Sequence, residues 1–280
     1  MTDAERLLRL RRKMFLTAYP LKTAHLASAF SVTELMYALY VKQLLRYRAE
    51  EPDWPERDRF ILSKGHASLA LYAMLNDVGM LDSERLSTFC RPGNSIGGEI
   101  NPLEAPGIEA ATGSLGHGLS FGVGQALALK LDKLPSHVWV LVGNGELDEG
   151  SIWEAAMSAY KFQLDNLTVI LDDNRLQKMG FTADIMGIED WSNKWRAFGW
   201  KVDNITDGHD LDEVIAILSQ PNLPHTPRVI IAHTTKGKGV SLMENDATWH
   251  FRMPKKRELK VFMNELNITE DELQACRERI

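Results

Sequence analysis

Short apolar runs recur along the chain, and most are followed by a glycine-rich or polar turn and then by a helical pattern. The runs are RFIL (59–62), VWVLV (138–142), LTVIL (167–171), WKVDNIT (200–206) and PRVIIA (227–232). Strands that are apolar on both faces, with helices between them, are typical of a parallel sheet covered on both sides. We therefore predict an α/β fold in three layers, with a mainly parallel sheet and helices on both faces.

The segments between these strands indicate how the chain is organised. Helices are expected over residues 3–18 and 31–45, the second with Ser31 as its cap and Glu34 three positions later. Residues 90–113 are too rich in glycine and proline for a regular element, and we expect them to form a long functional loop.

No composition shift and no internal repeat divides the chain. We expect one domain over residues 1–280, with a helical N-terminal extension and a helical C-terminal tail that begins near Lys255. The tail is amphipathic, and we expect a solvated helix pair, with docking to a partner as the alternative.

Charge and cysteine content argue against several kinds of partner. Lys and Arg total 32 against 38 Asp and Glu, and a net charge of -6 gives no indication of a nucleic-acid partner. Cys90 and Cys276 belong to no CxxC or Cys/His cluster, so we predict neither a disulfide nor a zinc site. The N-terminus carries charges where a signal peptide is apolar, and no stretch approaches the roughly 20 apolar residues of a membrane span. We expect a cytoplasmic protein without membrane contact.

Parallel sheets bind ligands at the carboxyl ends of their strands, and two turns there carry unusual residues. GNGELDEG (143–150) directly follows a strand, and its amides can face an anion near the helix expected from about Ile152. The next strand ends in LDDNRLQ, which contains Asn174. Amide oxygens of Asn144 and Asn174 beside a phosphate-binding turn are suitable ligands for Mg²⁺ shared with a diphosphate. Taken alone, the glycine turn is equally compatible with a purely structural role.

Together these two segments resemble the fingerprint of thiamine diphosphate enzymes, GDGxxxEG followed along the chain by Asn, in the version found in transketolases. Further matches to transketolases are SKGHAS (63–68), PGIEAATGSLGHGLS (106–120), GHD (208–210) and HTTKGKGVSLMENDATWH (233–250). The resemblance covers almost the whole chain. It implies the thiamine diphosphate-binding fold, thiamine diphosphate as cofactor, and Mg²⁺, with Ca²⁺ or Mn²⁺ as substitutes.

Carried over position by position, the resemblance implies a role for each matching residue. The implied metal ligands are the side chains of Asn144 and Asn174 and the carbonyl of Leu176. The implied cofactor-binding residues are Lys64, His66, Gly113, Leu115, Gly145, Glu146, Asn174, Lys236 and His250. The implied catalytic residues are His25, His250 and Glu149, the last through a carboxylate link between active sites. The implied substrate contacts are His25 and Glu99, whereas the role of His117 stays open.

Two positions depart from the transketolase pattern. Asn144 replaces the usual aspartate among the metal ligands, which predicts weaker Mg²⁺ binding without its loss. Glu99 stands where transketolases commonly place a histidine that contacts the donor sugar. A carboxylate at that position is expected to change which donors are accepted.

In transketolases, the glutamate that activates the cofactor lies on a following pyrimidine domain, which this sequence does not supply. We therefore expect one half of a two-chain transferase, paired with a separately encoded chain that carries the pyrimidine and C-terminal domains. The expected assembly is a heterotetramer with two copies of each chain. It would transfer a two-carbon ketol unit from a ketose or ketose phosphate to an aldose. The alternatives are a subunit of a thiamine diphosphate enzyme acting on a 2-oxo acid, and a non-catalytic cofactor-binding homologue.

Overall fold

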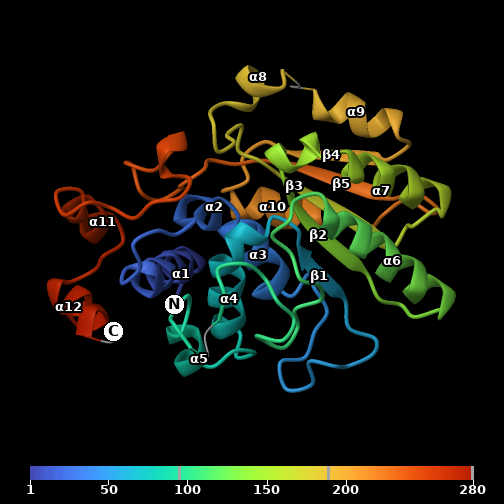
Figure 1. Cartoon of the computed structure of the whole chain (residues 1–280). Helices are drawn as coiled ribbons and strands as arrows, with labels where there is room; N and C mark the ends of the chain where they lie inside the picture. Colours follow the sequence, from blue (N-terminus) through green and yellow to red (C-terminus); the bar gives the residue numbers. More distant parts are fainter. Residues whose placement is uncertain (94–95, 188–189, 279–280) are drawn as a thin grey trace.

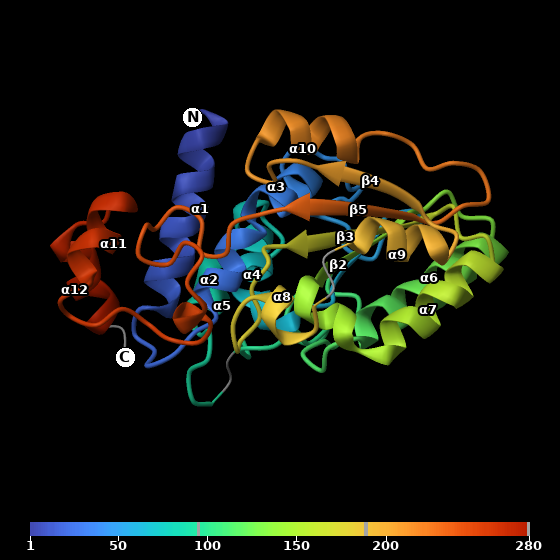
Figure 2. The same cartoon turned by 90° about the horizontal axis from the view of Figure 1, so that it is seen from above.

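Five parallel strands form one sheet in the computed structural model, which describes residues 1–93, 96–187 and 190–278 (Figure 1). The strands are β1 (Arg59–Leu62), β2 (Val138–Gly143), β3 (Leu167–Asp173), β4 (Lys201–Ile205) and β5 (Arg228–His233). Their order across the sheet is β1-β2-β3-β5-β4, and each neighbouring pair is parallel (Figure 2). The predicted α/β fold with a parallel sheet is confirmed.

Helices cover both faces of the sheet, as predicted. One face carries α1 (Asp3–Ala18), α2 (Leu26–Ser31), α3 (Thr33–Tyr40), α4 (Ser68–Asp77), α5 (Ser83–Ser87) and α10 (Leu211–Leu218). The other face carries α6 (His117–Leu131), α7 (Gly150–Lys161) and α9 (Trp191–Ala197). The remaining helices are α8 (Thr182–Ile185), α11 (Leu259–Glu265) and α12 (Glu270–Glu278).

The central strands are buried on both faces because each contributes to two hydrophobic clusters. In β2, Val138 and Val140 belong to the cluster under α6 and α7, whereas Trp139 and Leu141 belong to the cluster under α1 to α4. Successive side chains of a strand point to opposite faces, which explains why the strand is continuously apolar rather than alternating.

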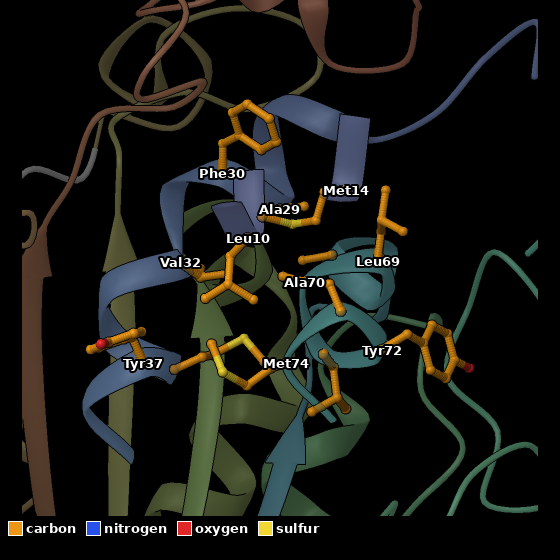
Figure 3. Packing of buried hydrophobic residues seen from close by; sticks show 14 of the residues in the cluster. Leu10, Met14, Ala29, Phe30, Val32, Tyr37, Leu69, Ala70, Tyr72 and Met74 are labelled. Carbon is orange, nitrogen blue, oxygen red and sulfur yellow. The ribbon is translucent and has the colours of Figure 1, made fainter. Parts of the chain in front are cut away.

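The cluster on the α1 side joins four helices to the sheet. Figure 3 shows Leu10 and Met14 of α1 beside Phe30 of α2, Val32 and Leu69 of α4. All five side chains are buried, and each buried large side chain contributes about 1.5–3 kcal/mol to folding. The N-terminal helices are therefore part of the main core of the chain.

The helix expected over residues 31–45 is wrong in its start and its length. Two short helices meet here: Ser31 ends α2, and α3 ends at Tyr40. Ser31 caps no helix, because its Oγ donates to Asp172 Oδ2 at 2.9 Å. Glu34 is buried in a pair with Arg11, with two nitrogen–oxygen distances of 2.7 Å. Buried charged partners have taken both members of the expected capping pattern.

The expectation of a solvated C-terminal helix pair is also wrong. Phe262 of α11 is fully buried and its ring centroid lies 5.2 Å from that of Phe15 on α1. Arg12 of α1 also forms an ion pair with Glu272 of α12. The two helices lie beside α1 in both views (Figures 1 and 2), so the apolar face of the tail is covered by the chain's own core.

Within residues 1–93, 96–187 and 190–278, no helix combines the length and the apolar character that crossing a membrane requires.

Candidate functional site

A cavity of about 320 Å³ lies at the carboxyl ends of the strands and gathers nearly all the predicted site residues. Glu149 is the exception. The predicted residues around the cavity are His25, Lys64, His66, Glu99, Gly113, Leu115, Asn144, Gly145, Glu146, Asn174, Leu176, Lys236 and His250. Sequence reasoning missed four further residues of the lining, which are Ser28, Gly143, Gln177 and Lys178. All four lie within three positions of a predicted residue, and that proximity is the signal that could have found them.

Asp172, the penultimate residue of β3, is the buried anion beside this cavity. It is fully buried and accepts hydrogen bonds from Lys64 Nζ at 2.5 Å, Ser31 Oγ at 2.9 Å, Asn174 Nδ2 at 3.0 Å and Thr234 Oγ1. Burial alone would raise the pKa of Asp172, but Lys64 and these hydrogen bonds lower it. The pair fixes Lys64 at the rear of the cavity.

The turn after β2 is a 3-10 helix over Asn144–Asp148, fastened by Glu146. The buried carboxylate of Glu146 accepts from Gly143 N at 3.1 Å, from Gly116 N at 2.9 Å and from Ser63 Oγ. Burial raises the pKa of Glu146, and the three hydrogen bonds oppose that rise. Because α7 begins only at Gly150, this 3-10 turn lines the cavity in place of the helix start expected near Ile152.

Two glycines of the lining allow close approaches that a side chain would block. A Cβ on Gly145 would lie 2.9 Å from Gln177 Cγ. Gly113 has φ +142°, and a Cβ there would lie 2.8 Å from Glu99 Oε2. Glycine is therefore required at both positions for the cavity to keep its shape.

The predicted metal ligands are neutral oxygen donors whose orientations are fixed. Asn144 Nδ2 donates to Thr182 Oγ1 at 3.1 Å, and Asn174 Nδ2 donates to Asp172 Oδ2 at 3.0 Å. Each Oδ1 accepts one backbone N–H, from Gly145 at 2.8 Å and from Leu176 at 3.1 Å, and so keeps a second lone pair. In the described part of the chain, no cluster of three or more His, Cys, Asp or Glu is arranged to hold a metal. The amide oxygens fit a hard divalent cation shared with an anionic ligand.

Three histidines stand together in the cavity. The ring centroids of His25 and His66 lie 5.2 Å apart, those of His25 and His250 5.2 Å, and those of His66 and His250 5.6 Å. Lys236 Nζ lies 3.0 Å from His250 Nδ1. An ammonium can only donate, so His250 accepts at Nδ1 and carries its proton on Nε2.

Burial and neighbouring lysines keep these imidazoles neutral. Burial, with Lys236 and Lys64, lowers the pKa of His25 to about 4. Burial, with Lys236 and His25, lowers the pKa of His250 to about 3, and burial takes the pKa of His66 well below its usual value. Burial and the nearby Lys64 also lower the pKa of Lys236 to about 8. At pH 7 the cavity therefore contains neutral histidines beside a lysine that is still mostly protonated.

A second cavity of about 360 Å³ adjoins the first and shares His25, His66 and Glu99 with it. Lys22 and Phe89 are among its other lining residues. Much of Glu99 is exposed, yet partial burial raises the pKa of its carboxyl group. Apart from an isolated bridge between Ile100 and Thr112, the described part of loop 90–113 forms no regular element, as expected.

Glu149 lies outside the cavity. It is the exposed N-cap residue of α7, and its side chain lies beside Gly116 at the start of α6. His117, whose role the sequence leaves open, is exposed at the first position of α6. The structure therefore separates Glu149 from the other predicted catalytic residues, His25 and His250.

Comparison with known proteins gives the same family for sequence and structure. The family described as "Transketolase, thiamine diphosphate binding domain" matches residues 17–273. One of the separately named subunits of the apulose-4-phosphate transketolase of Phocaeicola vulgatus is 41% identical over 245 residues, covering 87% of this chain and 86% of that protein. The 6-deoxy-6-sulfo-D-fructose transketolase subunit SqwG of Clostridium sp. is 42% identical over 231 residues, covering 82% of this chain and 83% of that protein.

A crystal structure of transketolase from Campylobacter jejuni superimposes with a TM-score of 0.85 at 26% identity, covering 100% of this chain. The chain spans only 46% of that transketolase. With the family match over residues 17–273, these likenesses confirm the resemblance that the motifs indicated. The chain belongs to the transketolase family, as a thiamine diphosphate binding domain.

Proposed function

We propose that this chain is the N-terminal, diphosphate-binding subunit of a split transketolase. With a separately encoded partner it would transfer a two-carbon ketol unit from a ketose or ketose phosphate to an aldose. The observation that carries the proposal is the cavity, in which Lys64, Lys236 and three histidines stand beside two oriented asparagine amides. The two relatives named as separate subunits match this chain over more than four fifths of their own length.

Each group has a task in this proposal. Lys236 and the amide of Gly145 would bind the diphosphate, and Asn144, Asn174 and the Leu176 carbonyl would hold Mg²⁺. The cofactor supplies a nucleophilic carbon that attacks the carbonyl of the donor sugar.

The neutral histidines at the junction of the two cavities supply the proton chemistry. With a pKa of about 4, His25 can accept a proton from a donor hydroxyl at neutral pH, whereas an imidazolium could not. His250 Nε2–H can donate a hydrogen bond to an oxygen of the substrate or cofactor. Neutral His66 completes the wall between the two cavities.

Replacing Asn144 with aspartate is expected to tighten Mg²⁺ binding about tenfold in the presence of thiamine diphosphate, because a carboxylate adds a charge to the ligand set. Thr182 Oγ1 can donate to the new carboxylate, so the local packing is kept. Calorimetric Mg²⁺ titration measures the effect. Asn193→Asp, on exposed α9, is the control without a change. Equal or weaker affinity in Asn144→Asp would contradict the assignment.

Replacing Glu99 with histidine is expected to change the ratio of kcat/KM for two donor ketoses about tenfold, because Glu99 borders both cavities. Glu99→Gln separates the loss of charge from the change of shape. Competition between a phosphorylated and an unphosphorylated ketose in the reconstituted enzyme gives the ratio. Glu154→His, on the exposed side of α7, is the control. An unaltered donor profile in both Glu99 variants argues against a role in specificity.

The partner in this proposal carries the pyrimidine and C-terminal domains, and a heterotetramer places each cofactor between unlike chains. Exposed Glu149 would meet the other half of the assembly. We further propose Mg²⁺ as the resident metal and the cytoplasm as the compartment, since the cavity is built from lysine, histidine and amide groups.

Reconstitution tests the proposal. The purified chain, Mg²⁺ and thiamine diphosphate are assayed with ketose donors and aldose acceptors, with and without the partner. We expect ketol transfer only with the partner, and a mass of the complex that fits two copies of each chain. Transfer by this chain alone refutes the split. Turnover of pyruvate instead of ketoses supports the 2-oxo acid alternative, and failure to bind thiamine diphosphate supports a non-catalytic homologue.

A further inference from the structure

A buried charged network lies outside the cavity and joins three segments of the chain. Arg11 on α1 donates through Nη2 to both carboxylate oxygens of Glu34 on α3, each at 2.7 Å. Glu34 Oε2 also lies 3.0 Å from Nδ1 of His209, in the turn before α10. The side chains of Arg11, Glu34 and His209 are 8%, 5% and 5% exposed. Such a network is costly to desolvate, and a carboxylate there is retained only with its partners in place.

The second nitrogen of His209 determines the direction of this network. Nε2 lies 2.8 Å from the backbone nitrogen of Thr235. A backbone N–H can only donate, so Nε2 accepts and the proton of the neutral ring lies on Nδ1. Nδ1–H then donates to Glu34. Arg11 and Glu34 therefore orient the imidazole, and the imidazole holds the Thr235 N–H.

Thr235 directly precedes Lys236, whose amine reaches into the cavity. The same loop is held on either side, because Thr234 N donates to Asp173 O at 3.2 Å and Gly237 N donates to Ala27 O at 3.0 Å. These contacts join the loop to β3 and α2. The contact with His209 is made at the residue next to Lys236, so its loss would shift the lysine backbone more directly than a distant change in the core.

We propose that His209 is a positioning residue of the cofactor cavity: anchored by Glu34 and Arg11, it fixes Thr235 and thereby sets where the Lys236 amine meets a diphosphate. The inference rests on the proposed function of the cavity. His209 touches neither the cofactor nor the substrate in this arrangement, and it acts through the backbone. The GHD motif at residues 208–210 thus gains a physical role.

Two substitutions at this position separate the hydrogen bond from the packing. In His209→Gln the amide oxygen reaches the place of Nε2 and keeps an acceptor for Thr235. In His209→Asn the shorter amide reaches only the place of Nδ1, so the Thr235 N–H loses its acceptor. Calorimetry on the full chain with Mg²⁺ and thiamine diphosphate is expected to show about tenfold weaker binding in His209→Asn and about wild-type binding in His209→Gln.

A double-mutant cycle with Lys236→Met distinguishes positioning from general destabilisation. If His209 acts through Lys236, adding His209→Asn to Lys236→Met causes no further loss of affinity. An equal loss in both backgrounds, or no loss in His209→Asn alone, overturns the inference. Failure of the wild-type chain to bind thiamine diphosphate, or wild-type affinity in Lys236→Met, refutes the proposed cofactor site instead.

Nitrogen-15 NMR of the wild-type chain decides the matter even where His209→Asn does not fold. We expect an unprotonated His209 Nε2 and a Thr235 N–H signal that shifts when thiamine diphosphate is added. A proton on Nε2, or a Thr235 signal that is insensitive to the ligand, overturns the inference.

Discussion

Replacing Lys236 with methionine is expected to weaken the binding of thiamine diphosphate roughly 30- to 100-fold at pH 7, equivalent to about 2–3 kcal/mol. Lys236 is only 2% exposed, and the charge-assisted hydrogen bond that it offers a diphosphate is therefore shielded from water. Methionine keeps most of the side-chain length and removes the charge. Calorimetry in the presence of Mg²⁺ measures the loss.

The pH dependence gives a second readout of the same residue. Burial, the nearby Lys64 cation and the opposing Asp172 anion set the pKa of Lys236 at about 8 in the free chain. A bound diphosphate raises that pKa, so wild-type affinity is expected to fall about tenfold per pH unit above pH 8 until the pKa of the complex is reached. The phosphate groups and the cavity histidines do not ionise in this range, because phosphate titrates near pH 6 and His25 near pH 4.

In Lys236→Met this dependence above pH 8 is expected to disappear. Lys178→Met is the matched control, because Lys178 lines the same cavity but is exposed, and only a few-fold effect is expected from an exposed charge. Equal losses for the two lysine variants, or a persistent pH dependence in Lys236→Met, would contradict the assignment of the diphosphate to Lys236.

Replacing Lys64 with methionine is expected to lower the free energy of unfolding by about 3–5 kcal/mol, because it leaves the fully buried Asp172 without a counter-charge. Ser31, Thr234 and Asn174 still donate hydrogen bonds to Asp172, but none of them supplies a charge. The midpoint of thermal unfolding is expected to fall by about 10 °C. Urea and thermal unfolding of the free chain measure both changes.

Two comparisons interpret that result. Lys42→Met breaks the ion pair of Lys42 with Asp3, whose side chains are 34% and 44% exposed, and it is expected to cost under about 1 kcal/mol. The double variant Lys64→Met with Asp172→Asn removes the uncompensated charge and is expected to regain most of the stability. A loss in Lys64→Met no larger than in Lys42→Met would show that Asp172 needs no counter-charge.

The strands could be predicted because burial on both faces leaves its mark in every residue of a run such as 167–171. The order of the strands could not, since each run is apolar and fits any interior position of the sheet. The helix over residues 3–18 was predicted correctly, and its first turn is closed by a local capping box between Thr2 and Glu5. The same spacing at Ser31 and Glu34 misled the prediction, because both side chains are buried and have partners far away in the sequence.

Most of the cavity was predictable because its residues lie in short segments that follow strands and resemble family motifs. The partners of these residues were not predictable. Lys64 carries no sequence signal for Asp172, and GHD shows no link to Thr235, because both contacts arise only when separate segments fold together. The separation of Glu149 from the cavity follows from one local detail, the 3-10 turn that intervenes before α7.

The packing of α11 and α12 on α1 has a consequence for synthesis on the ribosome. Arg12 and Glu272 are 260 residues apart in the sequence, so this side of α1 has no cover until nearly the whole described chain has been made. Until then a nascent chain exposes Phe15, which later packs on Phe262. Contacts of such long range form late and leave apolar surface open to aggregation. Completion of this core is therefore expected to be post-translational.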